Sequence, residues 1–245
     1  MKQTSLALGC GGRRIQKEVA AVGSGPKTKM PFLLNIVKKY KNSEDSLSFQ
    51  PYPILQPGMA KQAGSTLLYK DKHCILVNDA FPKSFVHCLI MPQDTSLLSL
   101  NDLNASHLEL VLHMKQVADD YVAFLKKSLP TVYKNRRFIS GFHSLPSLPM
   151  LHMHLLTLDL DSPCLKNKKH YNSFATFFFL SSERVIEDLT THHRITLNQD
   201  VKQLHQLEEQ SMCCLWCGEP LANVPAMKQH IRTCKENKSM TTETK

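Results

Sequence analysis

The sequence predicts an α+β protein, in which helices cover an antiparallel sheet and a small zinc finger follows. Three observations predict this class. Short β-rich runs separated by turns begin near Ser65, a long helical pattern interrupts them, and cysteines gather near the C-terminus. A sheet that buries a face against a helix is a two-layer arrangement. With 245 residues, 42% of them apolar, the chain can hold one ample core.

The first part of the chain reads as tail, short helix and linker. Residues 1–30 contain five glycines and basic residues with one acid, which indicates a disordered basic N-terminus. A mitochondrial leader is the alternative, since leaders are basic and poor in acids. Pro31 is placed to open a short basic helix over 31–42. Residues 43–64, rich in Ser, Gln and Pro without a period, are expected to be a linker or an inserted loop.

The strand-like runs cover 67–69, 74–77 and 85–91, and two more follow around 137–139 and 151–156. Between them, Asn104 can cap a long helix. Its apolar positions recur near a 3.6-residue period: Leu108, Val111, Leu112, Ala118, Val122 and Leu125. No apolar run reaches the roughly 20 residues that a membrane-spanning helix needs.

Two histidines, His152 and His154, stand two positions apart in an apolar run. A strand would place both side chains on one face of the sheet. Burying two imidazoles side by side is costly unless a polar group lies between them. A phosphate fits, because one imidazole can attack phosphorus while its neighbour donates to a phosphoryl oxygen.

This run resembles the histidine-triad pattern His-x-His-x-His, with Met150 at the first position. The segments 141–147 and 161–174, followed by a cysteine-rich finger, are similar to the aprataxin family of DNA 5′-adenylate hydrolases over roughly residues 65–234. The resemblance implies a histidine-triad fold over 65–195, a zinc finger over 196–236 and a disordered tail over 237–245. It is nearest to compact fungal-type members, so no forkhead-associated domain is expected.

The resemblance also implies roles. His152 would attack the AMP phosphorus and form a covalent nucleotidyl-histidine, while His154 and Ser147 would hold phosphoryl oxygens. His143 and His87 would lie near the 5′ phosphate and the leaving group, where a protonated imidazole could neutralise the departing phosphate. The first triad histidine of the family orients the others, and a thioether at Met150 cannot donate. Another group, such as a backbone carbonyl, must then fix the tautomer of His152.

Asp79 matches the ribose-binding acid of the family, and Lys83 matches a basic residue near the leaving group. Each of these residues also has a plain structural interpretation. Asp79 can be a turn residue, Lys83 a surface lysine and His87 a satisfied core histidine.

The late cysteines have zinc-finger spacing. Cys214 and Cys217 are followed after twelve residues by His230 and Cys234, which can lie one helical turn apart. Four such ligands can close a tetrahedron around a structural zinc ion. Cys213 offers an alternative register with Cys217, but the register that begins at Cys214 is preferred.

Basic residues point to a polyanionic partner. The formal net charge is +9 and the isoelectric point is near 9.1. A loop after the His152 strand is expected to carry DNA contacts: Lys166, Lys168, Lys169 and His170. The family uses its N-terminal helix as a wedge against the base stack, and Phe32 is the aromatic residue available for it. The alternatives are a solvated charged face for the loop and a core-facing Phe32.

The resemblance implies a nuclear DNA-repair hydrolase that removes AMP from 5′-adenylated ends left by abortive ligation. Its partners would be nicked or adenylated DNA and AMP, and its cofactor a structural zinc ion. One alternative is a small-molecule nucleotide hydrolase, either a phosphoramidase or a dinucleoside polyphosphate hydrolase. Another is a non-catalytic DNA-binding protein in which Met150 marks a decayed site. The sequence leaves open the preferred nick chemistry, RNA–DNA junction preference and oligomeric state.

Overall fold

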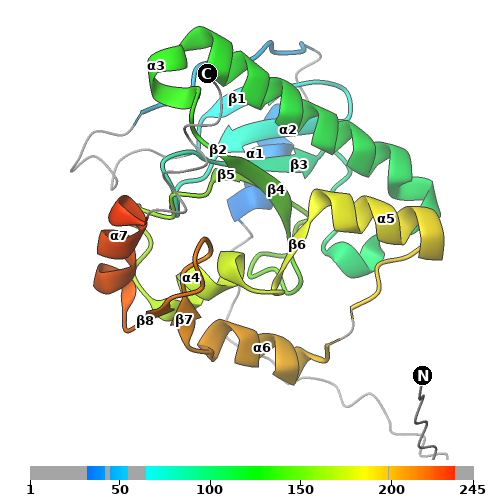
Figure 1. Cartoon of the computed structure of the whole chain (residues 1–245). Helices are drawn as coiled ribbons and strands as arrows, with labels where there is room; N and C mark the ends of the chain where they lie inside the picture. The colour runs from blue at the N-terminus through cyan, green and yellow to red at the C-terminus, as the bar shows by residue number, and fades with distance from the viewer. Residues whose placement is uncertain (1–31, 42–44, 55–64, 198, 235–245) are drawn as a thin grey trace, which may run out of the picture.

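The computed structural model describes residues 32–41, 45–54, 65–197 and 199–234. A six-stranded antiparallel sheet forms its centre, in the order β1-β2-β3-β5-β4-β6 (Figure 1). Its strands are β1 (Leu67–Lys70), β2 (Cys74–Asn78), β3 (His87–Pro92), β4 (Phe138–His143), β5 (Met153–Thr157) and β6 (Phe179–Ser181). The expected strands are confirmed, whereas β6 was not anticipated.

Helices α2 (Leu108–Ser128) and α5 (Ser182–His192) cover one face of this sheet (Figure 1). Asn104 caps a 3₁₀ turn, η2 (Ala105–His107), which runs directly into α2. Leu112, one of the apolar positions in the helical period, is 39% exposed. Three residues of α2 that carry the core were missed: Met114, Val117 and Tyr121. Two short elements flank the helix, η1 (Leu100–Asp102) and α3 (Pro130–Tyr133).

Two helices lie on the opposite face and leave a gap between them. The predicted N-terminal helix is α1 (Phe32–Lys41), whose Leu33 and Val37 pack on side chains of β2 and β3. Helix α4 (Lys168–Ala175) packs through Tyr171 and Phe174 farther along the same face, against Leu156 of β5. Successive side chains of β5 point to opposite faces of the sheet, so Leu155 lies on the α2 side and His154 faces this gap.

The segment 45–54, which was expected to be part of a linker or an inserted loop, has no helix or strand of its own but packs against the sheet. Leu47 forms an isolated bridge with Lys70, and the Gln50 N–H donates to the Leu68 carbonyl. Tyr52 is buried, and its hydroxyl accepts from the His87 backbone N–H at 3.2 Å. This segment therefore pairs with the edge strand β1 through Leu47 and contacts the start of β3 through Tyr52.

The C-terminal region consists of α6 (Val201–Glu209), β7 (Met212–Cys213), β8 (Pro220–Leu221) and α7 (Val224–Thr233). Met227 and Ile231 of α7 join Tyr171 and Leu156 in one hydrophobic cluster. The predicted finger region thus shares a core with the region that carries the histidines. None of the described helices is long and apolar enough to cross a membrane. The expected disordered segments, 1–30 and 237–245, lie outside the described residues.

Candidate active site and zinc site

A pocket of ≈ 510 Å³ opens in the gap between α1 and α4. Most residues singled out in the sequence line it, from segments far apart along the chain. They are Asp79, Lys83, His87, His143, Ser147, His152, His154, Lys169 and His170. The structure therefore brings these side chains together, and their individual roles stay predictions.

His152 lies in the extended segment just before β5, and its orientation is fixed by the main chain. Its Nδ1 is 2.7 Å from the Met150 carbonyl oxygen, so Nδ1–H is the donor and Nε2 keeps a lone pair. The expectation that a backbone carbonyl sets this tautomer is confirmed. The Met150 side chain is fully buried among apolar residues of α1, β2 and β3, so this position serves packing.

A chain of hydrogen bonds sets the tautomer of His154. The Lys83 backbone N–H donates to His87 Nδ1 at 3.1 Å, so the proton of His87 lies on Nε2. That Nε2 is 3.0 Å from His154 Nδ1, which must accept. The proton of His154 is then on Nε2, a buried atom with no hydrogen-bond partner among the described residues. His154 thus offers an N–H donor beside the lone pair of His152, whose ring centroid is 4.8 Å away.

The histidines of the pocket are neutral. Burial lowers the pKa of His87 to about 4, although the carboxylate of Asp79 opposes the shift. Burial also lowers the pKa of His152. The pKa values of His143 and His154 lie well below the ordinary value, mainly because of burial and also because a charge on either ring would be repelled by a charge on a neighbouring imidazole. Burial therefore favours the neutral forms of His87 and His143 in the free protein, and the role expected for them beside the leaving phosphate stays a prediction. Neutral imidazoles suit a nucleophile and a neutral donor.

Asp79, Lys83 and Ser147 lie at the rim of the pocket. Asp79 Oδ1 accepts from the Phe81 N–H at 2.7 Å, and Oδ2 is 3.5 Å from His87 Nδ1. The Lys83 ammonium donates to the Phe81 carbonyl, which places its charge near the mouth. Ser147 is exposed on the loop before Met150. Asp79 is thus both a turn residue and a pocket residue.

Aromatic rings that the sequence analysis did not single out enclose the histidines. The Phe174 ring centroid is 4.7 Å from that of His143 and 5.3 Å from that of His154. Phe179 of β6 approaches because Gly141 faces it. A Cβ at Gly141 would lie 2.3 Å from the Leu180 carbonyl oxygen, so only glycine fits there. Nothing local in the sequence marks Phe174 and Phe179 as neighbours of β5.

The lysine run was expected in a loop, and the structure corrects this. Asn167 caps α4, so Lys168, Lys169 and His170 form its first turn. Lys168 and Lys169 both pair with Glu209 at the end of α6, at 3.3 and 3.0 Å. Lys166 has no ion pair among the described residues. Phe32, the expected wedge, begins α1, and the next residue, Leu33, lines the pocket.

The four expected metal ligands converge. The ligand atoms of Cys214, Cys217, His230 and Cys234 all lie within 4.8 Å of one another. The Cys217 sulfur is 3.3 Å from His230 Nε2, and the Cys214 and Cys234 sulfurs are 4.0 Å apart. Tetrahedral zinc with Zn–S bonds of about 2.3 Å places sulfurs about 3.8 Å apart. The donor set and spacing therefore fit zinc, whereas the exposed Cys213 lies in β7 outside the cluster.

The turn that holds the first two cysteines also fits a zinc site. Gly218 has a φ of 73°, which glycine adopts without strain, and its N–H donates to the Cys214 carbonyl. The Trp216 N–H donates to the Cys214 sulfur at 3.4 Å. On the other side, Glu219 lies 3.4 Å from His230 Nδ1, so it can orient the imidazole.

Two protein-family models match the chain in sequence. The model described as scavenger mRNA decapping enzyme C-terminal binding matches residues 54–170. The model of the C2HE / C2H2 / C2HC zinc-binding finger matches residues 175–237. The first covers the pocket histidines and the second covers the cysteine cluster.

Curated relatives match most of this chain. Aprataxin of Danio rerio is 36% identical over 166 residues, which is 68% of this chain and 48% of that protein. The chain belongs to the aprataxin family. An aprataxin-like protein of Schizosaccharomyces pombe is 28% identical over 83% of this chain and 87% of the relative.

This aprataxin-family chain spans about half the length of the Danio rerio relative. Among solved structures, the aprataxin ortholog Hnt3 from Schizosaccharomyces pombe is 26% identical, with a TM-score of 0.49. That match covers 71% of this chain and 86% of the Hnt3 chain.

Proposed function

We propose that this protein hydrolyses 5′-adenylated DNA ends, releasing AMP through a covalent histidine–AMP intermediate. The observation that carries the proposal is the arrangement of two nitrogen atoms. The Nε2 lone pair of His152 and the Nε2–H of His154 lie side by side in one pocket, each fixed by its own hydrogen bond. An attacking atom and a donor for the phosphoryl oxygen are the two groups that nucleotidyl transfer needs.

The reaction has two displacements. His152 Nε2 bonds to the phosphorus of AMP, and the phosphate of the DNA end leaves with the electron pair of the broken P–O bond. Water then attacks the same phosphorus and gives up a proton to solvent, the electron pair of the broken P–N bond returns to His152 Nε2, and AMP is released. His154 donates to the phosphoryl oxygen in both steps. The Lys83 ammonium, which donates to the Phe81 carbonyl at the pocket, would offset the charge of the leaving phosphate.

DNA as the substrate is supported by the family and by the charge around the pocket. Lys83, Lys169 and His170 line the catalytic pocket, and Lys166 and Lys168 follow at its edge. Phosphate contacts of this kind position a strand without reading its sequence. The second part of the proposal is that Cys214, Cys217, His230 and Cys234 hold one structural zinc ion. Zinc would supply folding energy to the finger.

The test compares two substrates with the wild-type protein. A 5′-adenylated nicked duplex and adenosine phosphoramidate are each incubated with it, and AMP release is followed. We expect turnover of the adenylated DNA with a much higher kcat/KM than that of the small compound. Efficient turnover of the phosphoramidate alone would favour a small-molecule hydrolase, and DNA binding without turnover of either would indicate a decayed site. Either result contradicts the proposal.

A further inference from the structure

A cluster of metal-ligating side chains lies on the α2 side of the sheet. It joins Asp71 and Cys74, at the turn from β1 into β2, with His113 of α2. One ligand atom of each residue lies within 4.8 Å of those of the other two. None of the three residues lines the catalytic pocket or belongs to the finger, so the function proposed above gives the cluster no role.

The carboxylate of Asp71 is held in place from several sides. Its Oδ1 accepts from the backbone N–H groups of His73 and Cys74, both at 2.8 Å. Its Oδ2 accepts from the Tyr69 hydroxyl at 3.0 Å and lies 2.5 Å from His113 Nε2. Hydrogen bonds of this kind orient the carboxylates that bind metal ions. Asp71 therefore presents a fixed oxygen beside His113 and Cys74.

The turn that carries these ligands is anchored to the end of β3. The Gln93 backbone N–H donates to the His73 carbonyl at 2.8 Å, and the Gln93 side-chain amide donates to the Asp71 carbonyl. Cys74 is fully buried, whereas Asp71 and His113 are partly exposed. The ligands are therefore already assembled, with the sulfur inside and the oxygen and nitrogen accessible to an ion from solvent.

A second imidazole lies beside the cluster. The ring centroids of His73 and His113 are 5.0 Å apart. Two imidazoles that bind one tetrahedral ion through bonds of about 2.0 Å have their centroids about 5 Å apart. His73 is exposed, so its side chain can turn a ring nitrogen toward the other three ligands. One carboxylate oxygen, one sulfur and two nitrogens suit zinc, whereas Mg²⁺ and Ca²⁺ prefer oxygen ligands alone.

We propose that this cluster binds a zinc ion, separate from that of the finger, through the side chains of Asp71, Cys74, His113 and His73. The Cys74 thiol gives its proton to solvent as the sulfur–zinc bond forms, and the ion takes the place of the hydrogen between Asp71 and His113. Those two ligand atoms then move apart from 2.5 Å to about 3.3 Å, the separation around a tetrahedral zinc ion. The ion ties the β1–β2 turn to α2 and thereby stabilises the fold, independently of the proposed hydrolysis.

Cobalt binding tests the proposal, because a cobalt–thiolate bond absorbs in the near ultraviolet. The full-length protein first receives one equivalent of zinc, which the finger with its three thiolates binds more tightly. It is then titrated with Co²⁺. Cys74→Ser and His113→Gln each remove one ligand. Their matched controls are Cys88→Ser, which alters another buried thiol, and His205→Gln, which alters another helix histidine paired with a carboxylate.

We expect the wild type and both controls to bind one further equivalent of Co²⁺ with the thiolate band, and excess zinc to abolish the band by displacing cobalt. Cys74→Ser should lack the band, and His113→Gln should raise the Kd for Co²⁺ roughly tenfold or more. Excess zinc should also raise the Tm of the wild type more than that of either ligand variant. Circular dichroism checks folding. If Cys74→Ser misfolds, His113→Gln still decides, because glutamine at this partly exposed position can keep a hydrogen bond to Asp71.

The proposal is overturned if the wild type with its finger filled shows no thiolate band. It is also overturned if the ligand variants bind Co²⁺ as their controls do. The cluster would then be only a hydrogen-bonded contact between α2 and the turn. AMP release from adenylated DNA enters neither outcome, so this site and the proposed function are tested separately.

Discussion

At the scale of single residues, the main chain takes the role that a side chain has in a full histidine triad. The Met150 carbonyl sets the tautomer of His152, and His87, from a neighbouring strand, sets that of His154. A buried thioether at position 150 therefore leaves the imidazoles of His152 and His154 oriented. It also explains why α1 can pack directly over this part of the sheet.

His152→Ala should lower kcat on adenylated DNA by at least about a thousandfold, because the atom that forms the bond is gone. The Kd for nicked DNA should stay nearly unchanged, since the lysines around the pocket remain. Single-turnover kinetics and fluorescence anisotropy measure the two effects. A variant that keeps a substantial fraction of its turnover would place the nucleophile elsewhere.

The neutral state of His87 gives a stability prediction. The pKa of His87 is about 4 in the folded protein, and it is about 6.5 in an unfolded chain. Between these values the unfolded state binds the extra proton, so folding stability is full above about pH 6.5 and falls as the pH drops toward 4. Each such histidine contributes up to about 1.4 kcal/mol per pH unit.

Urea unfolding of the wild type and of His87→Gln at about pH 7 and about pH 5 measures this dependence. The loss of stability on acidification should be smaller for the variant, which lacks one titrating group. An equal loss in both proteins would mean that His87 is not buried as a neutral imidazole.

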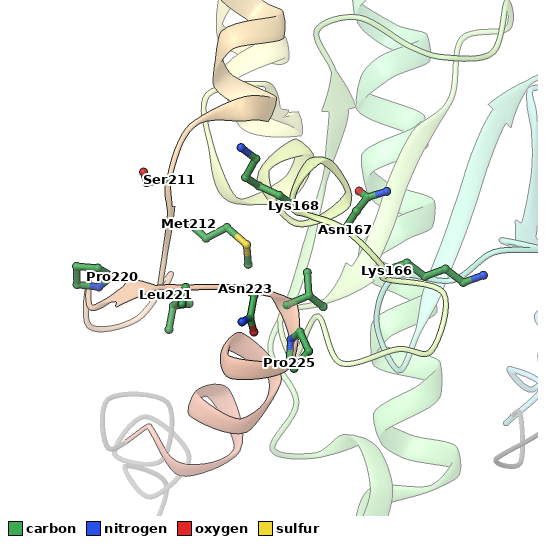
Figure 2. A pocket seen from close by; sticks show the side chains of 11 residues that line it. Lys166, Asn167, Lys168, Ser211, Met212, Pro220, Leu221, Asn223 and Pro225 are labelled. Atoms are coloured by element: carbon green, nitrogen blue, oxygen red, sulfur yellow. The ribbon is translucent and has the colours of Figure 1, made fainter.

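At the scale of elements, the start of α4 carries the lysines that we propose contact DNA beside the proposed catalytic pocket (Figure 2). Replacing Lys166, Lys168 and Lys169 together with Ala should weaken binding of nicked DNA. It should flatten the salt dependence by roughly 0.9 in slope for each phosphate left without its lysine. Lys202→Ala, in the exposed first turn of α6, is the matched control for a lysine outside this group. An unchanged slope in the triple variant would show that these lysines form only a solvated face.

The sequence predicted some elements much better than others, for local reasons. Strands β1 to β5 and helix α2 have clear periods, and Asn104 and Pro31 mark helix starts. The run 166–169 was interpreted as a loop because it is charged and the apolar residues that anchor the helix come only after it. Tyr171 and Phe174 make α4 a helix by packing on Leu156 and Phe179, contacts that no local pattern reveals. The three residues of β6 are too short to carry a period.

For the candidate site, the sequence predicted which residues come together better than it predicted their interactions. Motif spacing located the paired histidines, and the structure places His87 and His143 beside them. The burial that lowers the pKa values of these histidines follows from packing, which the sequence alone does not reveal. The pairing of Lys168 and Lys169 with Glu209 was also missed, since it joins helices far apart in the sequence.

At the scale of the whole molecule, the finger and the sheet share one core. Met227 and Ile231 of α7 pack with Leu165 and Tyr171, and the Tyr171 hydroxyl donates to the Cys213 carbonyl at 2.8 Å. Lys228 donates to the Ser162 carbonyl, and Arg232 pairs with Asp161. Helix α4, which forms one wall of the candidate pocket, therefore packs directly against the finger.

Cys217→Ser should release zinc and unfold the finger, because structural zinc supplies folding energy. The sheet with α2 should remain folded, while α4 loses its apolar support and turnover of adenylated DNA drops several-fold. Cys213→Ser, next to Cys214 but outside the ligand cluster, should keep both zinc and activity. Elemental analysis and turnover of the two variants decide. A zinc-free wild-type protein, purified without chelator, would contradict the account of the finger.

The central claim is that His152 Nε2 attacks the phosphorus of AMP. It is tested most directly by mixing the wild-type protein with a 5′-adenylated nicked duplex and stopping the reaction under alkaline denaturing conditions, in which a phosphoramidate survives. Peptide mass spectrometry then locates the added AMP. The account predicts the adduct on the peptide that contains His152, with fragment ions assigning it to that residue and with no adduct in His152→Ala. An adduct on His154, or AMP release with no adduct at any time point, would contradict it.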